Sequence, residues 1–187
     1  MKTLINNQEK TFVIKKSKFI TYTKKVMTEN EAINFLNKIK NEYQDATHVC
    51  YAYIIDNHHK YSDDGEPSST AGKPMFDILE KNNLNYVISI VIRYFGGIKL
   101  GSNGLIRAYS SCVKETINNN IKELEYGYKI IIEEDYSKEK LISYLLKNST
   151  IIKKDYTTKI YLEVIINKEM LIELSNINYK IIEEVIL

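Results

Sequence analysis

The chain of 187 residues has no tryptophan, two prolines and two cysteines, and no apolar run approaches the roughly 18 residues of a membrane span. Cys50 and Cys112 lie in apolar stretches and match no metal-binding or redox spacing, so we expect buried, reduced thiols. Polar residues 6–9 stand where a signal peptide needs its apolar core. These absences predict a cytoplasmic protein with no membrane segment, and we expect neither a metal nor a cofactor.

An excess of charge of either sign is also absent, because the formal net charge is only +2. The composition, 44% hydrophobic and 27% charged, is typical of a folded soluble protein. Residues 1–124 carry 17 Lys and Arg against 13 Asp and Glu, whereas residues 125–187 carry 9 against 11. A polyanion, if one binds, should therefore contact the N-terminal half.

Glycine is scarce, yet four of the seven glycines fall within residues 92–109, between a run typical of a buried strand and one typical of a helix. A Gly-rich turn that leads into a helix offers free backbone amides and the helix dipole to an anion. The expected anion-binding residues are Arg93, Tyr94, Gly96, Gly97, Lys99, Gly101, Asn103, Gly104 and Arg107. The alternative is a tight turn whose glycines only let the helix pack on the sheet, and the P-loop pattern is absent. The flanking cations favour binding, because a turn has no need of them.

The periodicity of the N-terminal half predicts an alternation of strands and helices. We expect a bent strand, or two strands meeting at a bulge, at residues 11–26, and a helix after the capping box of Thr28 and Glu31. Further strands are expected at residues 48–56 and 85–94, and further helices at 74–81 and 103–119. The polar segment 57–73 is expected to be a long functional loop.

A linker is expected at residues 118–123, after which the pattern restarts. The order is strand (128–134), helix (137–147), strand (150–156), strand (159–167), helix (168–175) and strand (180–186). This β-α-β-β-α-β order is that of a ferredoxin-like unit. The sequence therefore predicts an α+β protein with an N-terminal domain at residues 1–122 and a ferredoxin-like C-terminal domain at residues 126–187.

Acidic and imidazole side chains in and around the polar segment suggest several roles. Asp63, Asp64 and Glu66 do not have the spacing of a calcium loop. They would either pair with the cations of the Gly-rich turn or carry acid chemistry, while nearby serines would cap the following helix. If the protein is an enzyme, the acid and base candidates are His48, Asp64 and Glu66. His58 and His59 are adjacent, so an extended chain points them to opposite sides.

A basic arm precedes these motifs and comprises Lys15, Lys16, Lys18, Lys24 and Lys25. Tyrosines near the motifs are Tyr51, Tyr53, Tyr94 and Tyr109. Aromatic rings beside cations are typical of proteins that bind unstacked bases, although tyrosines in strands are also ordinary packing residues. Of the four, Tyr94 is the best stacking candidate because it borders the Gly-rich turn.

Five motifs, at residues 16–20, 48–53, 62–68, 71–74 and 93–101, read KSKFI, HVCYAY, SDDGEPS, AGKP and RYFGGIKLG. In this order and spacing they resemble the YigZ/IMPACT family. The resemblance implies an N-terminal fold similar to the second domain of a small-subunit ribosomal protein and to a domain of elongation factor G, a β-α-β type with a left-handed crossover. It also implies a C-terminal domain similar to another domain of that elongation factor.

For the eukaryotic relatives the resemblance implies a regulator of translation under amino-acid starvation that binds a ribosome-associated protein. The sequence departs from the family pattern at Ser69 and Asn103, where Gly is common, and at Ser102, where Thr is usual. We therefore expect a cytosolic protein that engages RNA or the translation machinery through the Gly-rich cleft. The alternatives are an enzyme acting on a small phosphorylated or carboxylated metabolite in that cleft, and a protein-interaction module.

Overall fold

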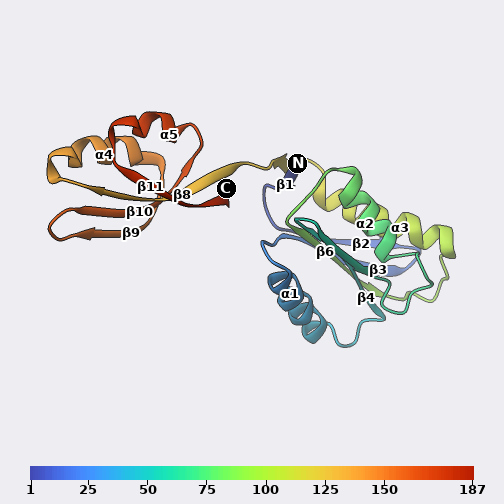
Figure 1. Ribbon diagram of the computed structural model, residues 1–187. Helices are drawn as coiled ribbons and strands as arrows, with labels where there is room; N and C mark the ends of the chain where they lie inside the picture. Colours follow the sequence, from blue (N-terminus) through green and yellow to red (C-terminus); the bar gives the residue numbers. More distant parts are fainter. The chain divides into compact units, whose positions relative to one another are not determined.

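A computed structural model describes residues 1–187, and the chain divides into two compact units, Met1–Glu123 and Leu124–Leu187 (Figure 1). Each unit combines helices with an antiparallel sheet, so the protein is α+β as the sequence predicts. None of its helices is both long and apolar enough to cross a membrane.

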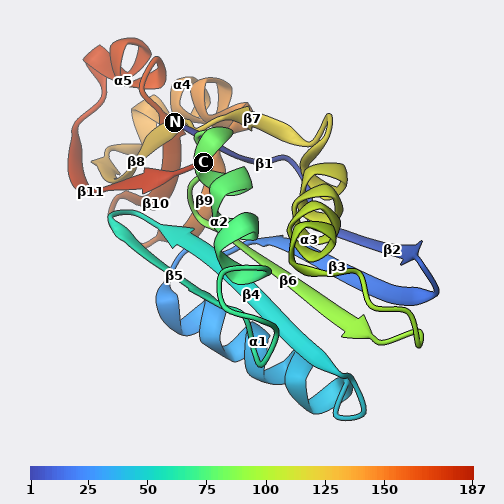
Figure 2. The same ribbon diagram turned by 90° about the vertical axis from the view of Figure 1, so that its right-hand side faces the viewer.

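The N-terminal unit is a five-stranded antiparallel sheet covered on both faces. In spatial order its strands are β2 (Gln8–Ile14), β3 (Ser17–Lys25), β6 (Val87–Tyr94), β4 (His48–Ile55) and β5 (His58–Ser62). Helix α1 (Glu29–Glu42) covers one face, and α2 (Gly72–Lys81) and α3 (Ser102–Ile117) cover the other (Figure 2). The short strands β1 (Lys2–Leu4) and β7 (Ile121–Glu123) pair with each other.

The central strand β6 is almost continuously apolar because both of its faces are buried. Val87 and Val91 pack towards α2 and α3, whereas Ile88, Ile90 and Ile92 pack towards α1. Because both faces of the sheet are covered, alternate residues of one strand enter two different cores. Each fully buried side chain of this kind contributes about 1.5–3 kcal/mol to folding.

Two crossover connections link parallel strands of this sheet. Strands β3 and β4 flank β6 and are connected through α1, while β5 and β6 flank β4 and are connected through α2. The first crossover starts from β3 and moves across the sheet towards β5. The second starts from β5, which runs antiparallel to β3, and moves in the reverse direction towards β3. With α1 and α2 on opposite faces, the two crossovers must therefore have opposite hands.

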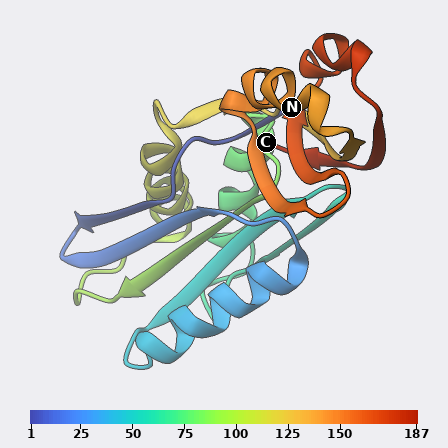
Figure 3. The same cartoon turned by 90° about the vertical axis from the view of Figure 1, so that its left-hand side faces the viewer.

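Two local expectations for the first half of the chain are wrong. The bulge expected within residues 11–26 is a two-residue hairpin turn at Lys15 and Lys16, with φ of 45° and 65°, which joins β2 to β3 (Figure 3). Positive φ at both central residues is the requirement of a type I′ turn, and the chain meets it here without glycine or asparagine. The expected loop 57–73 instead begins with strand β5, and α2 begins two residues before Pro74.

The expected linker at residues 118–123 is also ordered within the N-terminal unit. Asn118 is the C-cap of α3, and residues 121–123 form β7. The Asn120 side chain accepts from the Asn6 amide at 3.0 Å and donates to the Asn6 carbonyl at 2.8 Å. These bonds and the β1–β7 ladder fix the segment on the unit.

The C-terminal unit has the predicted order of elements. Its sheet contains, in spatial order, β11 (Tyr179–Ile186), β8 (Tyr126–Glu134), β10 (Ile160–Asn167) and β9 (Thr150–Tyr156), all antiparallel. The helix expected at 137–147 is α4 (Glu139–Leu145) flanked by short 3₁₀ turns, and the one expected at 168–175 is only α5 (Met170–Glu173) with a 3₁₀ turn. Both helices lie on the same side of the sheet (Figure 1), and the apolar side chains between helices and sheet form one core.

Both cysteines are free thiols in the core of the N-terminal unit, as the sequence predicts. Burial raises the pKa of Cys112 to about 12 and raises the pKa of Cys50 further, so both stay protonated and unreactive near neutral pH.

The loop before α2 contains a residue with a strained backbone, Ser69. Ser69 is exposed and has a φ of 61°, a conformation that costs a residue with a Cβ about 1–2 kcal/mol. Replacing it by glycine removes that strain and adds some backbone entropy to the unfolded chain. We expect Ser69→Gly to raise the free energy of unfolding by about 0.5–1 kcal/mol in urea denaturation. Ser68→Gly is the control, because Ser68 has no positive φ, and an equal gain there would contradict this explanation.

Candidate functional site

A buried ion pair joins the end of β6, just before the Gly-rich turn, to residues 63–66, which we call the acidic loop. Arg93 Nη1 donates to Glu66 Oε1 at 2.6 Å, and the two side chains are 6% and 3% exposed. The Tyr109 hydroxyl donates to the same carboxylate oxygen at 2.7 Å, and Arg93 Nη2 lies 3.4 Å from Ser17 Oγ. The expectation that Arg93 offers a free positive charge to a ligand is therefore wrong, because Glu66 neutralises it internally.

Aromatic rings enclose the same guanidinium group. Its central carbon lies 5.6 Å from the centre of the Phe19 ring and 5.7 Å from that of Phe95. Phe19 also packs edge-on against Tyr109. One atom of the group remains unsatisfied, because Arg93 Nε is buried and has no hydrogen-bond partner. Residues from three of the sequence motifs thus meet around one side chain.

The acidic loop is ordered by its own carboxylates. Asp63 Oδ1 accepts from the amides of Ala71 and Gly72 at the start of α2, both at 2.9 Å, and Oδ2 accepts from the Ser69 amide at 2.8 Å. Asp63, and not a serine, thus caps the start of α2. Burial alone would raise the pKa of Asp64, but hydrogen bonds from Lys40 and from the Val49 amide outweigh burial and lower it.

His48 lies between this loop and the ion pair. Its Nδ1 is 2.8 Å from the Asp64 carbonyl oxygen, an acceptor, so Nδ1 carries a proton. Its Nε2 is 3.8 Å from Glu66 Oε2. Of the three acid and base candidates, Asp64 and Glu66 are therefore already paired with cations. His48 is the one that keeps a polar atom without a close hydrogen bond, its Nε2. No group of three or more His, Cys, Asp or Glu is arranged to hold a metal ion.

A cavity of about 360 Å³ opens above this cluster, and we call it the α3 pocket. His48, Glu66 and Arg93 line it together with Phe95, Lys99, Leu100 and the first residues of α3. Gly101 has a φ of 72°, and no side chain caps the helix; the first intrahelical bond runs from the Leu105 amide to the Gly101 carbonyl at 2.9 Å. The amides of residues 102–104 consequently have no acceptor within the helix.

The glycines and Asn103 of the turn have different roles. A Cβ at Gly96 would overlap the backbone of Lys16, so this glycine lets the turn pack against the tip of the β2–β3 hairpin. Asn103 lies in the first turn of α3 and does not have a positive φ, so no special backbone conformation is required there.

The remaining predicted cations divide into two groups. Lys99 is exposed at the α3 pocket, whereas Arg107 and Lys15 line a neighbouring cavity of about 240 Å³, which we call the hairpin pocket. Lys16 and Lys18 are exposed on the same hairpin. Lys24 and Lys25 lie at the opposite end of β3, because Lys18 pairs with Tyr94 whereas Lys25 pairs with Val87. The five lysines of the expected arm are therefore not one cluster.

The tyrosines do not present faces for stacking in the α3 pocket. Tyr109 is fully buried, Tyr51 and Tyr53 stack on each other on the α1 face, and the Tyr94 hydroxyl donates to Asp45 at 2.8 Å. The exposed ring at the pocket is Phe95, at 47% exposure, which the sequence reading did not single out. Its position directly after Arg93 and Tyr94 in the 93–101 motif is the sequence feature that could have identified it as a pocket residue. Ser17, equally missed, bonds both Arg93 and the Gly96 amide.

The family model of the Impact N-terminal domain matches residues 15–117, so this α+β chain is of the class of proteins that carry that domain. The chain belongs to the IMPACT family. It is 52% identical over 114 residues to "IMPACT family member YvyE" of Bacillus subtilis, and 38% identical over 109 residues to "IMPACT family member YigZ" of Escherichia coli.

These matches cover 59% and 56% of this chain and 52% and 53% of the two relatives, so the chain spans about half the length of the curated relatives it matches. A solved structure described as "Crystal structure of an hypothetical protein" is similar over 97% of each chain, with a TM-score of 0.64 and 28% identity. The similarity in fold therefore extends beyond the region of the family model.

The buried ion pair should be a stability determinant. Removing Arg93 leaves the Glu66 carboxylate buried and uncompensated, and such losses cost about 3–5 kcal/mol. We expect Arg93→Ala to lower the free energy of unfolding by that amount in urea denaturation, with Lys73→Ala, which breaks the exposed pair with Asp77, changing it little. A small effect of Arg93→Ala would show that water reaches the pair and that it is not a fixed element of the core.

Proposed function

We propose that the N-terminal unit binds phosphate groups of RNA through the α3 pocket. The observation that carries this proposal is that the uncapped start of α3, at Gly101 and Ser102, lines one cavity together with the exposed Lys99 and the Arg93 side chain. Oriented amides at a helix N-terminus favour an anion, and a phosphate accepts several such bonds at once.

Exposed cations around the pocket favour a ligand with several negative charges over an isolated anion. Lys15, Lys16, Lys18, Lys99 and Arg107 are exposed, and none of them lies within 4.0 Å of a carboxylate. Unpaired cations on one end of a domain attract a phosphate backbone and release its counterions on binding. The exposed Phe95 ring offers a face on which a base can stack.

We further infer that the partner belongs to the translation machinery and that the protein acts in the cytoplasm as a regulator of translation. The resemblance to eukaryotic family members supports this role. The fold assignments fit it too: we assign the C-terminal unit to the ferredoxin-like type on its β11-β8-β10-β9 order, and the N-terminal unit to the elongation-factor-G type on its two crossovers of opposite hand. These assignments rest on topology and family resemblance alone.

A second candidate is an enzyme acting on a small phosphorylated metabolite, and His48 is the observation that favours it. Its Nε2 faces the α3 pocket beside Glu66, where it is placed to accept a proton. A phosphorylated sugar or nucleotide at 100 times its dissociation constant would stabilise the fold by about 2.7 kcal/mol, which a thermal-shift panel detects. We expect sugar phosphates not to raise the melting temperature. A large rise would favour the enzyme over RNA binding.

Salt dependence tests RNA binding directly. For single strands the slope of log affinity against log salt changes by about 0.7 for each phosphate contact. We expect Lys99→Ala/Arg107→Ala to weaken binding of a single-stranded RNA and to reduce this slope by about 1.4 in fluorescence anisotropy titrations.

The matched control is Lys38→Ala/Lys60→Ala, which removes two exposed, unpaired lysines from α1 and β5. Its slope should stay close to that of the unmodified protein. Equal slopes for both double variants, or an unchanged affinity of the first, would remove the support for the α3 pocket as the RNA site.

A further inference from the structure

We propose that the α3 pocket and the hairpin pocket are two adjacent phosphate subsites that hold successive nucleotides of a single RNA strand. This inference rests on the proposed function and specifies its ligand: a flexible single strand, bound by at least two consecutive phosphates, and not a duplex.

The first subsite is built from a buried cation and a helix start. The Arg93 side chain is 6% exposed, two of its nitrogens contact Glu66 and Ser17, and its Nε has no partner. An unpaired buried N–H costs about 1–3 kcal/mol. Because Arg93 lines the pocket, a small rearrangement on binding that brings a ligand oxygen to this N–H would remove that cost. Gly101 and Ser102, at the uncapped start of α3, line the same cavity.

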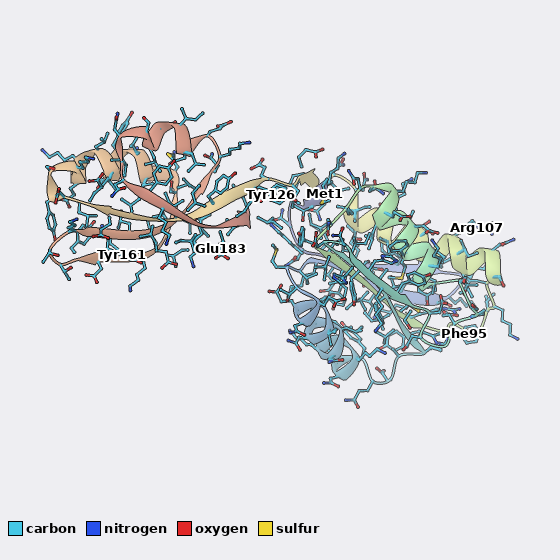
Figure 4. All side chains as sticks on the ribbon, in the orientation of Figure 1. Met1, Phe95, Arg107, Tyr126, Tyr161 and Glu183 are labelled. Carbon is cyan, nitrogen blue, oxygen red and sulfur yellow. The ribbon has the colours of Figure 1, made fainter.

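The second subsite lies across Leu100, which lines both pockets. Its cations come from two elements: Lys15 from the hairpin turn and Arg107 from α3. The hairpin is held against the Gly-rich turn by the close packing of Gly96 on Lys16. This packing fixes the backbone of the hairpin tip, which carries Lys15, relative to the Gly-rich turn. Phe95 and Arg107 lie at the same edge of the N-terminal unit (Figure 4).

The two pockets lie on different sides of the start of α3. Residues 102 and 107 are five positions apart, which is about 140° around the helix and about 7.5 Å along its axis. Leu100 lies between the pockets and faces Gly104, since a Cβ there would approach the Leu100 Cβ to 3.0 Å. A strand that crosses Leu100 would thus place one phosphate on each side of it.

The concave shape of the two sites selects against a duplex. A single strand can turn its backbone into two cavities and unstack a base onto Phe95, whereas a duplex presents a regular, stiff row of phosphates. The pockets, of about 360 and 240 Å³, are of the size that holds small groups of a ligand.

Short ligands with one or two phosphates test this arrangement. We would measure calorimetric affinities for uridine 5′-monophosphate and for 5′-phosphorylated uridylyl-uridine at low salt. We expect the unmodified protein to prefer the dinucleotide by about tenfold or more, and Lys15→Ala/Arg107→Ala to reduce that preference about tenfold. Lys99→Ala should weaken both ligands and leave the preference unchanged.

The controls separate this inference from the proposed function. Lys38→Ala/Lys60→Ala should alter neither affinity nor preference, and circular dichroism melting should show that all variants are folded. If Lys15→Ala/Arg107→Ala weakens both ligands equally, or if a duplex binds as tightly as the single strand of the same length, the two-subsite inference is overturned while RNA binding stands. If neither the dinucleotide nor a longer single-stranded RNA binds, the proposed function itself is wrong.

Discussion

The arrangement of the N-terminal unit depends on the buried pair of Glu66 and Arg93. This pair connects β6 to the acidic loop, and through Tyr109 and Ser17 it also ties α3 and β3 to the same point. A buried ion pair adds little net stability compared with apolar packing, because both charges must lose their water. Its effect is to admit one arrangement of these four segments, since any other leaves a charge uncompensated.

The same pair shapes the electrostatics of the α3 pocket. Because Glu66 cancels the Arg93 charge, the attraction for the proposed phosphate would come from Lys99 and from the amides at the start of α3. Asp63 and Asp64 are likewise occupied, by the α2 amides and by Lys40. The carboxylates of the acidic loop are therefore hydrogen-bonded or ion-paired beside the proposed phosphate site.

The sequence predicted the elements that have a clear apolar pattern and missed those that lack the usual pattern or depend on a distant contact. Apolar periodicity located β4, β6 and the β-α-β-β-α-β order of the C-terminal unit. It missed β5, whose residues are mostly exposed on a sheet edge, and the turn at Lys15 and Lys16, which lacks the usual glycine or asparagine. The pairing of Arg93 with a residue 27 positions earlier appeared only as one of several possibilities, because no periodicity encodes it.

Helix α3 begins without a side-chain cap, which affects the stability of its first turn. A serine, threonine, asparagine or aspartate at a helix start accepts from the first amides through its side-chain oxygen, and Gly101 of α3 has no such oxygen. An anion bound at the proposed phosphate site would accept from these amides as a cap does. Binding and the order of the first turn of α3 would then be linked, so that turn should be better ordered with the phosphate bound than without it.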